Sequence, residues 1–339
     1  MGKFQRPRAS RARFDRRDHD MRIVVKVGTS TLAHPTGRLN IQRMEKLCKV
    51  LSDLKNMGHE IILVSSGAIA MGFGKLNLSE RPKDVPTKQA SAAVGQCELM
   101  YIYDKLFTEY NHTVAQLLIT APDIEEGGVR KQNFHNTLAR LLELGALPVI
   151  NENDTISTEE FGIGDNDTLS AIVAVTIQAD LLILLSDIDG LFDGDPRKNP
   201  DAKLIDTVEK IDEHIISLGG GSGSSLGTGG MATKLRAAQM ATAAGCEMVI
   251  ANGQSPEVLY DVAAGKRVGT RFLAKRDEAG QRSNFWNAQK LPGAASAAQA
   301  PRRRTGCCSR WRRALRPTAK ISCAKMPRTW RRRRARSPM

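Results

Sequence analysis

The sequence lacks several features that would assign it to a common class of protein. No apolar run approaches the ~18 residues that a membrane-spanning helix needs, and the charged N-terminus has no apolar stretch typical of a secretory signal. The six cysteines form no C-x-x-C pair, so we expect neither a disulfide framework nor a metal site held by the protein. No internal repeat is visible. These absences favour a cytoplasmic protein in a reducing compartment, with no membrane contact.

Acidic residues are also missing from the last part of the chain. Residues 287–339 hold sixteen Lys and Arg, and residues 1–20 carry a net charge of +4, which leaves −6 of the total +14 for residues 21–286. We therefore expect one folded domain at residues 21–275 between two basic, disordered ends, an extension at 1–20 and a tail at 276–339. Met21 opens the first strand-like run, so a translation start at Met21 is one hypothesis. The alternative, an Arg-rich transit peptide, is disfavoured by the aspartates before Met21. The Arg-rich composition of the tail is typical of a reading frame translated out of register.

What is present is an alternation of strands and helices. Continuous apolar runs predict buried strands at Arg22–Val27, Glu60–Ser65, Thr113–Ile119, Leu147–Ile150, Asp180–Ser186 and Glu247–Ala251. Helical patterns lie between them at Ile41–Met57, Lys88–Tyr110, Arg130–Leu144, Thr168–Gln178 and Met231–Ala244. This order predicts an α/β fold, a three-layer αβα sandwich with a mainly parallel central sheet. A short alternating segment, Ser157–Gly164, predicts a strand of a side hairpin.

The ends of the first two predicted strands carry small and polar residues. Ligands of open α/β sheets bind at the carboxyl ends of the strands, so Lys26, followed by Gly-Thr-Ser, could bind a phosphate. The alternative is a lysine that only ends a strand. Ser66, before Gly67, could offer donors to a carboxylate or phosphate, or could simply cap a helix.

Two polar clusters follow the strand at Leu147–Ile150. Residues 151–154 read Asn-Glu-Asn-Asp, and residues 164–167 read Gly-Asp-Asn-Asp before the next helix. Asp165 or Asn166 could cap that helix, but two clusters exceed what capping requires. We expect Asn and Asp side chains here to bind the ammonium and carboxylate groups of a small zwitterion, with Asp167 orienting nearby lysines.

The third region with candidate ligands is a glycine-rich loop that ends against a helix. Residues 227–234 read GTGGMATK, and a helix N-terminus with exposed amides and Lys234 favours a polyphosphate. A dinucleotide site is rejected because no strand precedes the loop, and no Walker A motif exists in the chain. Ser186 and Asp187 end the strongest apolar run, where a nucleotide could meet the sheet. Residues 190–196 have the composition of a turn.

Residues 21 to about 275 resemble the glutamate 5-kinases of the amino acid kinase family. The motifs that carry the resemblance, in the family's order, are VVKVGTS, SSGAIA, AAVGQ, VINEND, GDND, LLSDIDGLF and GTGGMATK. The resemblance implies ATP-dependent phosphorylation of the L-glutamate γ-carboxylate, the first step of proline biosynthesis, with Mg²⁺ bound through the ATP phosphates. It implies catalytic roles for Lys26, Lys234 and Asp167, and glutamate binding by Ser66, Asp154 and Asn166. The residues implied to bind ATP are Lys26, Ser186, Asp187, Thr228, Gly229, Gly230, Met231, Ala232, Thr233 and Lys234.

The resemblance also raises expectations about partners. It implies a homo-oligomer, feedback inhibition by proline and hand-off of the acyl phosphate to glutamyl-phosphate reductase. The region after about residue 275 has neither the length nor the apolar pattern of the PUA domain that many bacterial members carry. Three other readings stay open: another carboxylate kinase of the family, a non-catalytic amino-acid sensor, and a nucleic-acid-binding protein that uses the basic tail, with Trp311 and Trp330 stacking on bases.

Overall fold

The computed structural model describes residues 20–34, 36, 38–124, 128–157, 165–196, 199–219 and 230–274. The predicted basic tail, the basic extension apart from residue 20, and the predicted hairpin strand apart from Ser157 lie outside these residues.

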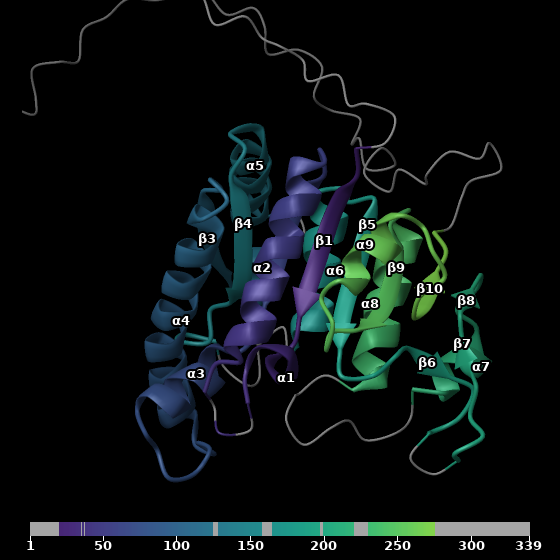
Figure 1. Cartoon of the computed structure of the whole chain (residues 1–339), viewed down its shortest axis with the longest axis horizontal. Helices are drawn as coiled ribbons and strands as arrows, with labels where there is room; N and C mark the ends of the chain where they lie inside the picture. Colours follow the sequence, from purple (N-terminus) through teal and green to yellow (C-terminus); the bar gives the residue numbers. More distant parts are fainter. Residues whose placement is uncertain are drawn as a thin grey trace, which may run out of the picture. The chain divides into compact units, whose positions relative to one another are not determined.

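A central sheet runs through the described domain (Figure 1). Its strand order is β3-β4-β2-β1-β5-β9-β10-β8, and every pairing from β3 to β9 is parallel. β10 runs antiparallel to β9 and parallel to β8, so the sheet is mainly parallel, as predicted. The strands of this sheet are β1 (Arg22–Val27), β2 (Glu60–Ser65), β3 (Val114–Ile119), β4 (Leu147–Glu152), β5 (Leu181–Ser186), β8 (Thr207–Val208), β9 (Glu247–Asn252) and β10 (Thr270–Phe272).

Helices cover both faces of the sheet and complete the three layers. Buried residues of α2 (Ile41–Asn56), α3 (Ala68–Lys75), α4 (Val85–Thr108) and α9 (Val258–Ala263) form one core cluster with the sheet. Buried residues of α5 (Val129–Glu143), α6 (Asn166–Thr176) and α8 (Met231–Ala243) form the cluster on the other face. The shorter helices are α1 (Thr29–Leu32), the 3-10 turn η1 (Ala121–Ile124) and α7 (Glu213–Ser217).

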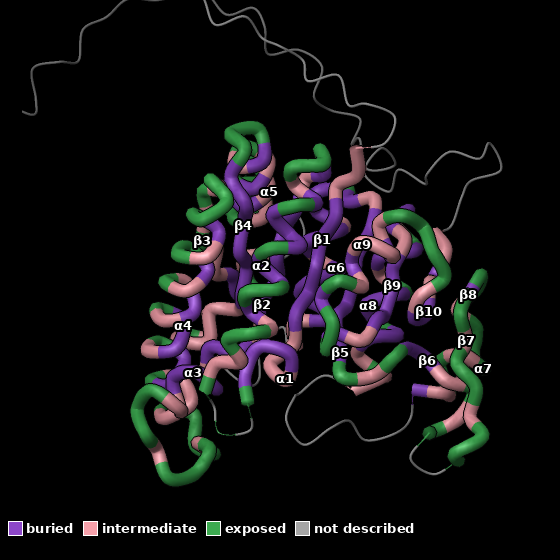
Figure 2. Tube along the Cα trace, viewed as in Figure 1, coloured by how far each residue is buried: buried purple, intermediate pink, exposed green. Residues whose placement is uncertain are grey.

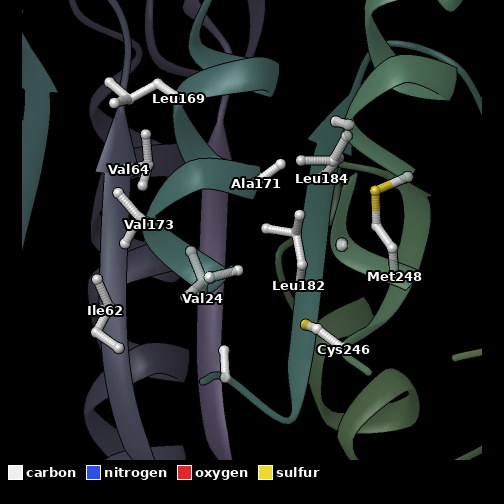
Figure 3. Close-up of a cluster of buried hydrophobic side chains, with 14 of the residues drawn as sticks. Val24, Ile62, Val64, Leu169, Ala171, Val173, Leu182, Leu184, Cys246 and Met248 are labelled. Atoms are coloured by element: carbon white, nitrogen blue, oxygen red, sulfur yellow. The ribbon is translucent and has the colours of Figure 1, made fainter. Parts of the chain in front are cut away.

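Side chains of the first strand alternate between the two clusters. Val24 packs with the α6 and α8 side, whereas Ile23 and Val25 pack with the α2 and α4 side, and all three are fully buried. Figure 3 shows this packing on the α6 side, where Val173 lies over the sheet close to Val24. Figure 2 shows the middle residues of β1 and β9 buried. Since the period of a strand is two residues, Lys26 projects to the same face as Val24.

Local sequence explains where several elements end. Gly58, Gly145 and Gly245 follow helices and have positive φ angles, which a glycine adopts without strain. The prediction of a turn at residues 190–196 was partly wrong, because Leu191–Phe192 forms the short strand β6, paired antiparallel with β7 (Leu204–Ile205). The Thr270 hydroxyl accepts a hydrogen bond from the Leu191 amide, a contact between distant residues that local composition does not encode.

Candidate active site

Two buried lysines contact one buried carboxylate at the carboxyl end of β1. The Lys26 Nζ atom lies 2.6 Å from Asp167 Oδ1, and the Lys234 Nζ atom lies 3.0 Å from Asp167 Oδ2. The residues come from β1, α6 and α8, and each is less than a tenth exposed. We call Lys26, Asp167 and Lys234 the lysine–aspartate triad. Its two cations and one anion leave a net charge of +1 inside the sandwich.

Each member of the triad has a local reason for its position. Lys26 is the second-last residue of β1, and the pleat of the strand turns it to the same face as Val24, where α6 and α8 pack. Asp167 lies in the first turn of α6, which Asp165 caps by accepting a hydrogen bond from the Thr168 amide at 2.7 Å. Of the two residues that sequence left open as the cap, it is therefore Asp165, and Asn166 is available for another contact.

The helix that carries Lys234 also holds Asp167 from a second side. The Thr233 hydroxyl lies 3.0 Å from Asp167 Oδ2 and 2.8 Å from the Gly230 carbonyl, at the N-terminus of α8. Thr233 therefore contacts the triad, whereas the sequence suggested it only as a nucleotide ligand. The helix N-terminus adds partial positive charge where Lys234 lies.

The pKa of Asp167 is set by two opposing effects. Burial disfavours the carboxylate and would raise its pKa, but the charges of Lys26 and Lys234 and their hydrogen bonds outweigh burial and lower the pKa to about 2. Asp167 is therefore ionised throughout the neutral range. A carboxylate this acidic cannot act as a general base at neutral pH, so its chemistry is to hold two ammonium groups at one place.

A chain of polar side chains lies at the ends of neighbouring strands. Asn166 Nδ2 donates to Ser66 Oγ at 2.7 Å and to Asn151 Oδ1 at 3.0 Å, and Asn151 Nδ2 donates to Gln96 Oε1 at 3.0 Å. We call Gln96, Asn151, Asn166 and Ser66 the amide relay. Both Nδ2 hydrogens of Asn166 are engaged in it. Ser66 does not cap α3, because Gly67 is the N-cap, in the left-handed region at φ 107°.

The turn that leaves β4 carries the remaining acidic candidate. Partial burial and the charge of Glu152 raise the pKa of Asp154 to about 6. Glu152 itself accepts a hydrogen bond from Ser157 Oγ at 2.6 Å. Asp154 lies three residues after Asn151 of the amide relay, at the same edge of the sheet. A carboxylate that is costly to ionise gains from a cationic ligand.

The structure describes part of the predicted nucleotide-binding set. Ser186 ends β5, and its hydroxyl lies 3.2 Å from the Asp187 carboxylate, which is exposed. Gly230, Met231, Ala232 and Thr233 form the start of α8, next to Lys234. Thr228 and Gly229 lie outside the described residues.

Sequence reasoning missed two residues of this region. Gln96 was noted only as part of a family motif, and Asn151 only as part of a polar cluster. Both are buried, Gln96 is hydrogen-bonded to Asn151, and Asn151 is hydrogen-bonded to Asn166. A glutamine inside an apolar helix was the available signal, because buried amides need partners. Nothing local indicated that this partner, Asn151, lies near the end of β4.

The fold and the triad together define a class of protein, a three-layer α/β sandwich in which two buried lysines meet one aspartate at the carboxyl end of the first strand. Residues 21–252 match the amino acid kinase family, and the chain belongs to it.

Curated relatives named glutamate 5-kinase are similar over most of this chain. The protein from Clostridium perfringens is 53% identical over 76% of this chain and 97% of its own length. That from Clostridium tetani is 55% identical over 74% of this chain and 94% of its own. That from Caldanaerobacter subterraneus is 54% identical over 76% of this chain and 69% of its own.

Solved structures with low sequence identity share the fold. Carbamate kinase from Giardia lamblia bound to AMP-PNP is 17% identical with a TM-score of 0.54, and covers 76% of this chain and 99% of its own. The isopentenyl phosphate kinase of T. acidophilum is 18% identical with a TM-score of 0.52, covering 74% of this chain and all of its own. None of the helices described here is long and apolar enough to span a membrane.

Proposed function

We propose that the chain is a glutamate 5-kinase, which transfers the γ-phosphoryl group of ATP to the γ-carboxylate of L-glutamate as the first step of proline biosynthesis. The observation that carries the proposal is the lysine–aspartate triad, which sets two ammonium groups beside the amide relay at one edge of the sheet. The proposal is supported by relatives of that name with 53–55% identity over about three quarters of the chain.

The triad is suited to the phosphoryl end of the reaction. Lys26 and Lys234 are assigned to the transferring phosphoryl group, and the start of α8 to the ATP phosphates, since helix N-termini and lysines bind anions. Asp167 holds both ammonium groups in place before ATP arrives. The assignment extends the ATP site to Ser186 and Asp187, and to residues 228–234.

The amide relay and Asp154 are suited to the amino acid. Because both Nδ2 hydrogens of Asn166 are engaged, its Oδ1 atom is left to accept from the ammonium group of glutamate. Ser66 Oγ accepts from Asn166 and can therefore donate its own hydrogen to a substrate carboxylate. Asp154 supplies the negative charge that pairs with the ammonium group.

The chemistry needs charge neutralisation more than proton transfer. The γ-carboxylate of glutamate has an ordinary pKa of ~4.3 and is already ionised at neutral pH, so no general base is required. Its oxygen attacks the γ-phosphorus, the bond to the β,γ-bridging oxygen breaks, and that electron pair leaves with ADP. The two lysines reduce repulsion between the anionic nucleophile and the phosphoryl group. One such preorganised donor is worth ~3–4 kcal/mol.

Magnesium fits this arrangement as a companion of the nucleotide. The described residues contain no group of three His, Cys, Asp or Glu side chains that could hold a metal ion, and both Asp167 oxygens face lysines. We assign Mg²⁺ to the ATP phosphates, where it would neutralise charge on the triphosphate.

Several further assignments follow from the family. We propose a cytoplasmic enzyme with its kinase domain at residues 21–275, a homo-oligomer inhibited by proline, and hand-off of the reactive acyl phosphate to glutamyl-phosphate reductase. The basic ends are assigned no part in the reaction.

The experiment that tests the function is an ADP-release assay with ATP and Mg²⁺, in which hydroxylamine traps the acyl phosphate. Glutamate, aspartate, acetylglutamate and carbamate are compared as acceptors. The proposal expects hydroxamate formation with glutamate in large excess over the others. Preference for another acid would identify a different carboxylate kinase, and no turnover with any acceptor would favour a sensor.

A further inference from the structure

We propose that helix α4 positions Ser66 through two chains of hydrogen bonds, and that Gln96 and Tyr103 are the positioning residues at which these chains begin. The inference rests on the proposed function, in which Ser66 binds glutamate. Neither residue touches the triad, so both act on the reaction through Ser66.

The first chain holds the backbone of Ser66. Tyr103 is fully buried, and its Oη atom lies 2.8 Å from Ser65 Oγ, which donates to the Ser66 carbonyl at 3.1 Å. Because a serine hydroxyl has a single hydrogen, Tyr103 is the donor to Ser65. The Ser66 amide donates to the Val27 carbonyl at 3.1 Å. The peptide groups on both sides of Ser66 are therefore held; we call Tyr103, Ser65 and Ser66 the hydroxyl relay.

The second chain is the amide relay, which holds the side chain of Ser66. Gln96 Oε1 accepts from Asn151, whose own Oδ1 accepts from Asn166, so Gln96 sets which way both amides point. With this polarity Asn166 donates to Ser66 Oγ. The reverse polarity would turn the Asn166 oxygen towards Ser66 and would use the hydroxyl hydrogen of Ser66 that the substrate needs.

Both chains begin on one rigid face of α4. Gln96 and Tyr103 are seven residues apart, about two helical turns, so they project from the same side of the helix. The helix is pressed against α3, which starts just after Ser66. A Cβ atom on Gly95 would lie 1.8 Å from the Ala68 carbonyl oxygen, and one on Gly72 would lie 1.7 Å from the Ser91 oxygen. The two helices thus meet backbone to backbone, and α4 has no room to shift relative to Ser66.

The test removes the first group of each relay without removing its packing. Tyr103→Phe keeps the ring that stacks on Phe107, and Gln96→Leu replaces the amide by an apolar group of similar size. We expect the glutamate KM to rise about three- to tenfold in each variant, with kcat within about twofold and the KM for ATP unchanged. Tyr101→Phe, at an exposed tyrosine of the same helix, and Gln132→Leu, at an exposed glutamine of α5, are the matched controls.

Two further measurements separate positioning from a loss of stability. In the hydroxyl relay, Tyr103→Phe should add nothing to Ser65→Ala, because either change interrupts the same chain. Hydrogen exchange of the segment 60–75, followed by mass spectrometry, should be faster in Tyr103→Phe and Gln96→Leu than in the controls.

The outcomes are distinct. An unchanged glutamate KM, or an equal rise in the KM values for ATP and glutamate, would overturn the positioning role. If the parent chain releases no glutamate-dependent ADP, the proposed function fails, and the exchange measurement then decides positioning by itself: exchange equal to that of the controls overturns it.

Discussion

At the scale of single residues, one carboxylate neutralises half of the positive charge of the candidate site. Lys26 and Lys234 would repel each other if they were buried side by side, and Asp167 allows both to be held at distances of 2.6 and 3.0 Å from its oxygens. Two buried cations without this anion would be costly to fold. Asp167 therefore lowers the free-energy cost of holding the two lysines together before the substrate binds, and it need not touch the substrate itself.

Removing one cation should slow the chemistry more than it weakens binding. We expect Lys234→Ala to lower kcat by about 10²–10³, because its charge acts where negative charge develops, with a modest change in the glutamate KM. Steady-state ADP release measures both. Arg236→Ala, at an exposed position of the same helix, is the control and should be near normal. Near-normal turnover in Lys234→Ala would remove this lysine from the reaction.

The role proposed for Asp154 predicts that the glutamate affinity depends on pH. The pKa of Asp154 is about 6, so protonation below pH 6 removes the negative charge that is proposed to pair with the substrate ammonium group. We expect the glutamate KM to rise as pH falls, roughly tenfold from pH 7 to pH 5, while the KM for ATP changes little. In Asp154→Asn the glutamate KM should be high and flat over this range. A parent profile without this rise would exclude Asp154 from substrate binding.

The ionised form of Asp154, which is proposed to favour glutamate binding, should lower the stability of the fold. Since the folded-state pKa is raised above the ordinary value of 3.8, ionising Asp154 opposes folding as pH rises through about 6. Asp154→Asn should therefore be more stable than the parent at pH 8, by about 1–2 kcal/mol, and equal to it below pH 4. Urea unfolding at the two pH values measures the difference, and a loss of stability at pH 8 would contradict it.

At the scale of elements, the contact between α3 and α4 is the tightest feature near the site. Gly95→Ala would place a methyl group 1.8 Å from the Ala68 oxygen, so the helices must separate. We expect a loss of unfolding free energy of at least about 1–3 kcal/mol and a higher glutamate KM, because α3 starts directly after Ser66. Thermal unfolding and kinetics measure the two effects.

A second glycine variant separates these effects. Gly145 has a positive φ of 75°, but a Cβ there meets nothing within 4 Å. Gly145→Ala should cost about 1 kcal/mol through backbone strain alone and leave the glutamate KM unchanged. If Gly95→Ala and Gly145→Ala raise the glutamate KM by the same factor, the rise is caused by a general loss of stability and not by separation of α3 from α4.

Element prediction from sequence succeeded where burial is continuous along a run. The runs that form β1, β2 and β5 each have at least three apolar residues in a row, all of them buried, so they identify strands covered on both faces. The short strands β8 and β10 carry no such signal. β10 spans three residues, and its place in the sheet depends on pairing with β9 rather than on its own composition. Strands of this length are determined by tertiary contacts.

At the scale of the whole molecule, the sandwich explains how distant residues meet. Local motifs suggested Lys26, Asp167 and Lys234 one by one, and the resemblance to a family assigned them to one site. Sequence spacing alone could not bring together residues up to 208 positions apart. Parallel crossovers bring the carboxyl ends of the strands from β3 to β9 in the sheet order to one edge, so the end of β1 lies beside the starts of α6 and α8 (Figure 1). Gln96 was beyond prediction, because its partner depends on the register of α4 against β4.

The basic ends provide a test at this scale. We expect residues 21–274 alone to keep glutamate-dependent ADP release within about twofold of the full chain, because the triad and the relays lie inside that range. Electrophoretic mobility shift of the full chain with single-stranded RNA, at 50 and 200 mM salt, is the parallel measurement. RNA binding by the full chain that is lost without residues 287–339, together with loss of turnover in the shorter chain, would favour a nucleic-acid-binding protein.

The wide separation of the triad in the chain has a consequence for the cell. Lys26 is made early in synthesis and Lys234 late, and neither helix α6 nor helix α8 can place its residue until the sheet beneath it has assembled. A half-made or misfolded copy thus lacks the complete pair of cations to which phosphoryl transfer is assigned in the proposed function. With these proposed roles, ATP is consumed only after the whole domain has folded, so the topology itself keeps an incomplete copy inactive.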